Sequence, residues 1–176
     1  MNLAQTRRYA IKAHGCQKYG PFAYSHHLNA AIAVALRFGF RDVQVRKRIW
    51  LHDVPEDCGI TAEQLLADGH ELDIVIVVMA VTDEPGKNRK IRKLLTYPKI
   101  RAVGHDAILV KLCDRIANVE FAITQREGKL KMYQSEHAEF TRQLRDRTDL
   151  ELEPMWNHLD SLLSPTGFAR TDRSAS

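Results

Sequence analysis

The stretch IWLHDVPEDCG, residues 49–59, sets ionisable side chains directly behind three core-forming residues. Its apolar start leads straight into His52-Asp53, and Glu56-Asp57 follow two residues later. Clustered carboxylates repel one another, and a charge beside a buried segment needs a partner. The fold must therefore bring positive charge to this point. A bound cation would do so, and the stretch raises the hypothesis of a metal site.

Bulk composition fits one soluble domain, which we expect to span residues 1–163. The chain has 176 residues, 44% apolar and 27% charged, enough to bury a sizeable core. A net charge of +4 is too small to indicate a nucleic acid partner, but it suits an anionic small-molecule substrate. We find no helix-turn-helix signal and no basic surface with interleaved aromatic residues. The final segment, residues 164–176, is small and polar, and we expect it to be disordered.

Location and assembly follow from similar observations. The longest apolar run, residues 74–81, is far shorter than a membrane span, so no membrane partner is expected. The start of the chain lacks the apolar segment of a signal peptide. Three scattered cysteines, at 16, 58 and 113, are typical of reduced thiols in the cytoplasm. A homo-oligomer stays open.

Apolar spacing along the chain is typical of helices and indicates an all-α fold. Asn2 and Thr61 are expected to cap helices, and Pro55 to kink or end another. The segment IVIVVMAV contains β-branched residues that favour strands, but no alternating partner strand accompanies it, so we expect a buried helix. The expected helices are residues 2–18, 27–38, 42–57, a short one from 61, 74–81, 102–124, 130–146 and 153–163.

On a helix, His52 and Glu56 share one face and Asp53 and Asp57 share the next. An ion held by His52 and Asp53 would have the acidic pair one turn away, close enough to reach a water molecule at the ion. Imidazole with carboxylate suits Mn²⁺, Fe²⁺ or Zn²⁺ better than Ca²⁺. Structural ion pairs explain the same residues equally well at this point. The candidates for the missing ligands are His26 or His27, and Asp114, which follows an apolar run.

The order of these motifs resembles the HD-domain phosphohydrolases, and more narrowly the RelA/SpoT hydrolase domain and the small alarmone hydrolases. The resemblance spans about residues 8–125. Its segments are AHGCQKYGPFAYSHH, LHDVPEDCGITAEQL, VTDEPGKNRK and VKLCDRIANVE. It implies an HD-domain helical bundle with one divalent ion, in the first place Mn²⁺, with Fe²⁺, Zn²⁺ and Mg²⁺ as alternatives. It also implies removal of pyrophosphate from the 3′ position of guanosine tetraphosphate and pentaphosphate.

The resemblance also implies roles for individual residues. The metal ligands would be His27, His52, Asp53 and Asp114. His27 is preferred to His26 because the family pattern is Y-x-x-H, and His27 stands three residues after Tyr24. The catalytic residues would be Glu56, Asp57 and Asn118. The substrate-binding residues would be Lys18, Tyr24, Lys111 and Arg115. The basic run at residues 87–93 is expected to be mostly a solvated face, of which one member is a candidate phosphate contact.

The chain departs from the family pattern around the first motif. Tyr19 stands where the alarmone hydrolases usually carry a basic residue, and Ala23 and Leu28 stand in place of prolines. These changes leave the four implied ligands intact but bear on the choice of base. The alternatives are therefore hydrolysis of another nucleotide, such as a (deoxy)nucleoside triphosphate, or nucleotide sensing without hydrolysis.

Overall fold

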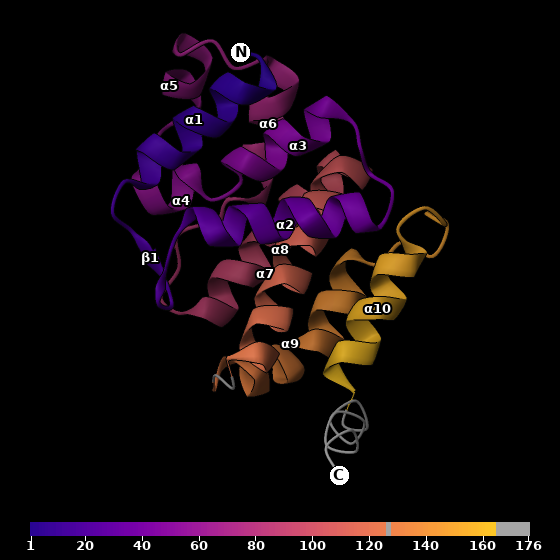
Figure 1. Ribbon diagram of the computed structural model, residues 1–176. Helices are drawn as coiled ribbons and strands as arrows, with labels where there is room; N and C mark the ends of the chain where they lie inside the picture. Colours follow the sequence, from indigo (N-terminus) through magenta and orange to yellow (C-terminus); the bar gives the residue numbers. More distant parts are fainter. Residues whose placement is uncertain (126–127, 165–176) are drawn as a thin grey trace.

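Helices cover most of the chain in the computed structural model, which describes residues 1–125 and 128–164 (Figure 1). The elements in chain order are α1 (Leu3–His14), β1 (Lys18–Tyr19), β2 (Phe22–Ala23), α2 (Ser25–Arg37), α3 (Val43–Leu51), α4 (Val54–Cys58), α5 (Ala62–Ala67), α6 (Leu72–Val81), α7 (Arg89–Val103), α8 (His105–Thr124), α9 (Lys129–Leu144) and α10 (Glu153–Leu163). The prediction of an all-α fold is confirmed. Residues 165–176 of the expected tail lie outside the described residues.

The first helix is shorter than predicted. Asn2 caps it through a capping box, as expected, but it ends at His14 because Gly15 takes a positive φ of 52°. The prediction that it continues to residue 18 is wrong. Residues 18–19 instead pair antiparallel with residues 22–23, with Tyr19 opposite Phe22. This short hairpin places Tyr19 beside the start of α2.

The helix predicted at residues 42–57 is two helices. The first ends at Leu51, and the second begins at Val54 with Pro55 in its first turn, where a missing N–H breaks no helical hydrogen bond. His52 and Asp53 therefore occupy a corner between α3 and α4 and do not lie within one continuous helix. The corner turns both side chains toward the rest of the bundle.

The last long helices are arranged around α8. The prediction that this helix starts at residue 102 is wrong, because α7 continues through Pro98 to Val103 and Gly104 separates the two. Helix α8 packs on α2, α3, α6, α7, α9 and α10, and Figure 1 shows it in the middle of the bundle. Its charged side chains Lys111, Asp114 and Arg115 are therefore buried. The apolar segment at 74–81 is helical, as predicted, and most of its side chains are buried, whereas Ile76 is 49% exposed.

The buried apolar side chains form two clusters. One joins α2, α8, α9 and α10 around Leu112, Phe140 and Trp156. The other joins the N-terminal helices around Leu51 and Ile74. No helix in residues 1–125 and 128–164 is long and apolar enough to cross a membrane. The corner at residues 52–53 lies where α2, α3 and α8 meet one another.

His70 links the folded state to pH. Its ring is 4% exposed beside Tyr9, and neither ring nitrogen is hydrogen-bonded within the described residues. Burial, and next the charge of the N-terminal amine, lower its pKa from the ordinary 6.5. At a pH between the pKa of His70 in the folded state and 6.5, the unfolded chain binds more protons than the folded protein. The contribution of neutral His70 to the free energy of unfolding is therefore complete above pH 6.5 and is lost as the pH falls below that value.

We expect His70→Phe, which keeps a ring against Tyr9, to flatten the acid-side loss of the free energy of unfolding. Urea unfolding of both proteins between about pH 5 and pH 8 measures this. Parallel stability curves for the two proteins would show that His70 does not contribute.

Candidate metal centre

Four side chains from three parts of the chain converge at the corner between α3 and α4. His27 comes from α2, His52 and Asp53 from the corner itself, and Asp114 from α8. One donor atom of each lies within 4.8 Å of the other three. The Nε2 atom of His27 is 3.3 Å from Asp53 Oδ2 and 3.4 Å from Asp114 Oδ1. The structure thus brings together the four ligands that the resemblance implies.

The chemistry of this donor set fits a divalent ion. The Nδ1 atom of His52 lies 2.7 Å from the carbonyl oxygen of Ile49, an arrangement in which Nδ1 donates and Nε2 presents a lone pair. That Nε2 atom is 3.0 Å from Asp53 Oδ2 and 3.3 Å from His27 Nε2. Lone pairs at these distances repel unless a cation or a proton lies among them. Adjacent ligands about 2.1 Å from one ion stand about 3.0–3.4 Å apart, which matches.

The shifted pKa values of the site also indicate that positive charge is needed among these side chains. Burial alone lowers the pKa of His52, but the charge of Asp53, followed by the hydrogen bond to Asp114, outweighs it and raises the pKa to about 10. The pKa of Asp114 is held well below its usual range, because Lys111 and the two histidines outweigh its burial. A bound divalent ion would take the place of the protons on the histidines.

Hydrogen bonds hold both ligand carboxylates in place. Tyr24 donates its hydroxyl to Asp53 Oδ2 at 2.6 Å, and Asn118 donates to Asp114 Oδ1. Lys111 Nζ lies 2.9 Å from Asp114 Oδ2. Such partners orient metal ligands and tune their basicity. Each of three implied site residues therefore contacts a candidate metal-binding carboxylate in this structure. Two of them, Tyr24 and Lys111, were implied as substrate-binding residues, and the third, Asn118, as catalytic. Their roles toward a substrate stay predictions.

The acidic pair on α4 stands next to the four ligands but outside them. Burial, and next the charge of Asp83, raise the pKa of Glu56, although its carboxylate reaches solvent. Asp57 accepts a hydrogen bond at 2.9 Å from the side chain of Gln17 on its Oδ2 atom. Both carboxylates line the same cavity as His27, Asp53 and Asp114. Their position is compatible with the predicted catalytic role, which stays a prediction.

The cavity beside the four ligands has a volume of about 170 Å³ and is rich in cations. Arg89 and Lys93, one helical turn apart on α7, line it together with Lys111 and Arg115. Two members of the run expected to be a solvated face thus reach the site, and their four-residue spacing was the signal available in the sequence. Burial, and next the charge of Lys111, lower the pKa of Lys93 to about 8.

Other candidates fall outside this cavity. Lys18 is exposed on β1 and is not among the lining residues. His26, the alternative ligand, is exposed, and its ring stacks on Phe22. Sequence reasoning assigned no role to Asp83, whose Oδ1 lies 2.8 Å from Lys93 Nζ, or to Tyr133, which lines the cavity.

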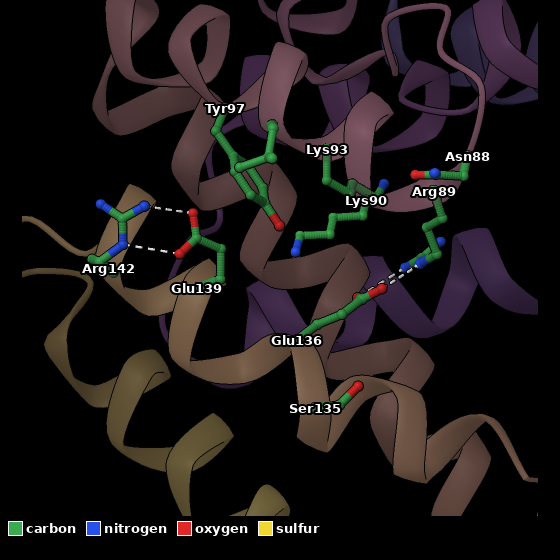
Figure 2. A pocket seen from close by; sticks show the side chains of 10 residues that line it. Asn88, Arg89, Lys90, Lys93, Tyr97, Ser135, Glu136, Glu139 and Arg142 are labelled. Carbon is green, nitrogen blue, oxygen red and sulfur yellow. Dashed lines mark hydrogen bonds and ion pairs between the residues drawn. The ribbon is translucent and has the colours of Figure 1, made fainter.

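A second, larger cavity adjoins the first between α7 and α9 (Figure 2). Its volume is about 820 Å³, and it shares Arg89 and Lys93 with the cavity at the metal centre. Glu136 on α9 hydrogen-bonds Arg89 at its edge, and Glu139 pairs with Arg142 further along. The two cavities therefore meet at Arg89 and Lys93.

The chain is thus an all-α bundle with a histidine–aspartate cluster at a helix corner. Among solved structures, the chain is similar to one described as a metazoan ortholog of SpoT that hydrolyzes ppGpp and plays a role in starvation responses. The TM-score is 0.70 at 22% sequence identity, over 90% of this chain and 93% of that chain. This likeness confirms the fold. No protein-family model matches the sequence, and no match was found among curated proteins.

Proposed function

We propose that this protein is a metal-dependent phosphohydrolase that acts on guanosine 3′,5′-bis(diphosphate) and releases pyrophosphate from the 3′ position. The observation that carries the proposal is the convergence of His27, His52, Asp53 and Asp114 on one point, beside two further carboxylates and a cluster of cations. The similar solved structure, described as hydrolyzing ppGpp, supports the same activity. The proposed ion is Mn²⁺, with Fe²⁺, Zn²⁺ and Mg²⁺ as alternatives, and the proposed location is the cytoplasm.

The residues of the site divide the chemistry among them. When bound by the two histidines and two aspartates, a divalent ion supplies a lowered pKa for water and an electrophile for a phosphoryl oxygen. Glu56 or Asp57 accepts the proton of the attacking water, since both face the cavity without being ligands. Lys93, Lys111 and Arg89 surround the same space and neutralise phosphate charge. Asn118 holds Asp114 in the orientation that the ion requires.

Tyr19 favours a relaxed choice of base. Its hydroxyl donates to Asn118 Oδ1 at 2.8 Å, and its ring lies 4.3 Å from that of Phe121. A tyrosine held in this way lacks the additional hydrogen-bond donors with which a cationic side chain distinguishes one base from another. We therefore propose less discrimination among nucleotides than the alarmone family shows.

Product analysis after incubation with a nucleotide panel tests both proposals. Metal-loaded protein is expected to convert guanosine 3′,5′-bis(diphosphate) to guanosine 5′-diphosphate and pyrophosphate, and to act on the adenosine analogue within about tenfold of that rate. Strict selectivity for guanine would contradict the role given to Tyr19. Release of tripolyphosphate from nucleoside triphosphates, with no pyrophosphate from the bis(diphosphate), would contradict the proposed reaction.

A further inference from the structure

Glu136 stands between two arginines where the two cavities meet. It accepts hydrogen bonds from Arg89 Nε at 2.6 Å and Nη2 at 3.2 Å, and from Arg115 Nη1 at 3.0 Å. Figure 2 shows the Arg89–Glu136 pair at the edge of the larger cavity. Arg89 lines both cavities, Arg115 only the one at the metal centre, and Glu136 only the larger one. The three side chains thus connect α7, α8 and α9.

Arg115 is the fixed end of this chain of contacts. Its side chain is 4% exposed, and its guanidinium carbon lies 4.9 Å from the ring centre of Tyr133 and 4.5 Å from that of Phe140. Two aromatic contacts and a hydrogen bond leave the guanidinium little freedom to move. Glu136, bonded to Arg115, is held in turn.

Arg89 is the free end. Its side chain is 36% exposed, and it uses one edge of the guanidinium, Nε and Nη2, for Glu136. Its Nη1 atom makes no hydrogen bond within residues 1–125 and 128–164. A guanidinium has five donors in a rigid plane, so fixing one edge also fixes the direction in which the other donors point.

We propose that Glu136 is a positioning residue. Anchored by Arg115, it directs Arg89 toward a phosphate that the reaction leaves on the nucleotide. The inference rests on the proposed function. The cavity at the metal centre, about 170 Å³, is smaller than the roughly 300–1,000 Å³ of small-molecule sites, so a nucleotide held there must extend outward. Arg89 stands where the larger cavity of about 820 Å³ opens.

A simpler role for Glu136 is that of counter-ion to the buried Arg115. That role alone predicts that Glu136→Gln destabilises the fold and leaves nucleotide affinity unchanged, because a buried charge loses its partner. Positioning predicts instead a loss of affinity that passes through Arg89. The two roles therefore differ in affinity, whatever happens to stability.

A double-mutant cycle of Glu136→Gln and Arg89→Met separates these roles. The readouts are the Kd of metal-loaded protein for guanosine 5′-diphosphate by calorimetry, the KM and kcat for the bis(diphosphate), and the urea midpoint. We expect Glu136→Gln to raise Kd and KM about tenfold with kcat little changed, and Arg89→Met to raise them at least as much. The double variant should bind no more weakly than Arg89→Met. The control Glu153→Gln, which removes a carboxylate partner of Arg145 away from both cavities, should leave Kd and KM unchanged.

Additive effects in the double variant, or unchanged affinity in Glu136→Gln, would overturn the proposal. Tighter binding in Glu136→Gln would overturn it too, since Glu136 would then compete with phosphate for Arg89. Absence of guanosine 5′-diphosphate binding by the wild type would have the same consequence. Binding that depends on both residues, in a protein that hydrolyses no nucleotide, would support the inference and refute the proposed function.

Discussion

Replacing His52 with alanine is expected to remove the proposed divalent ion and with it the proposed hydrolysis. Its Nε2 atom faces three other donor atoms from a ring that is 2% exposed and that is oriented by the carbonyl of Ile49. Loss of an outer partner of a metal ligand already lowers metal affinity about 10–100-fold, so loss of the ligand itself should exceed that range. Asp114→Ala should behave alike. Elemental analysis and metal titration of the purified variants measure the effect.

The matched control for this prediction is His137→Ala. His137 pairs with Asp160 at 2.7 Å on α9 and α10 and is not among the four clustered donors. Its loss should leave one ion per chain. Full metal occupancy in both His52→Ala and Asp114→Ala would remove these residues from the set of ligands.

Amide variants of the acidic pair are expected to slow turnover while the metal stays bound. Glu56→Gln and Asp57→Asn keep shape and remove charge, and loss of a general base costs about 10²–10⁴-fold in rate. Metal content should stay near that of the wild type, because neither carboxylate belongs to the four clustered donors. Substrate affinity should hold or rise slightly, since a carboxylate that repels phosphate is gone. Single-turnover rates and metal analysis of each variant measure these quantities.

Glu63→Gln, at an exposed position on α5, is the control for the loss of one carboxylate charge. The variant with the larger loss in rate identifies the base, a choice that the sequence leaves open. If both variants turn over at the rate of the wild type with metal bound, the acidic pair has a structural role only.

Local signals in the sequence determined much of this protein. Asn2 and Thr61 cap their helices as predicted, and the capping box expected at Thr61 is present. The segment at residues 74–81 is a helix despite its β-branched residues, because the burial of most of its side chains overrides an intrinsic preference. The order of the motifs, through the resemblance to a family, predicted four candidate ligands, and the structure brings these four side chains together. These predictions depend on residues close in sequence or on a pattern shared with a family.

Tertiary structure alone decided how the site is assembled. The break after Leu51 turned His52 and Asp53 into a corner, and the packing of α2 on α8 brought His27 to Asp114. The direction of α7 set Arg89 and Lys93 into the cavity, and the packing of α9 placed Glu136 between two arginines. These pairings join residues far apart in the chain. They depend on the angles at which whole helices pack, and those angles are fixed by the fit of many buried side chains together.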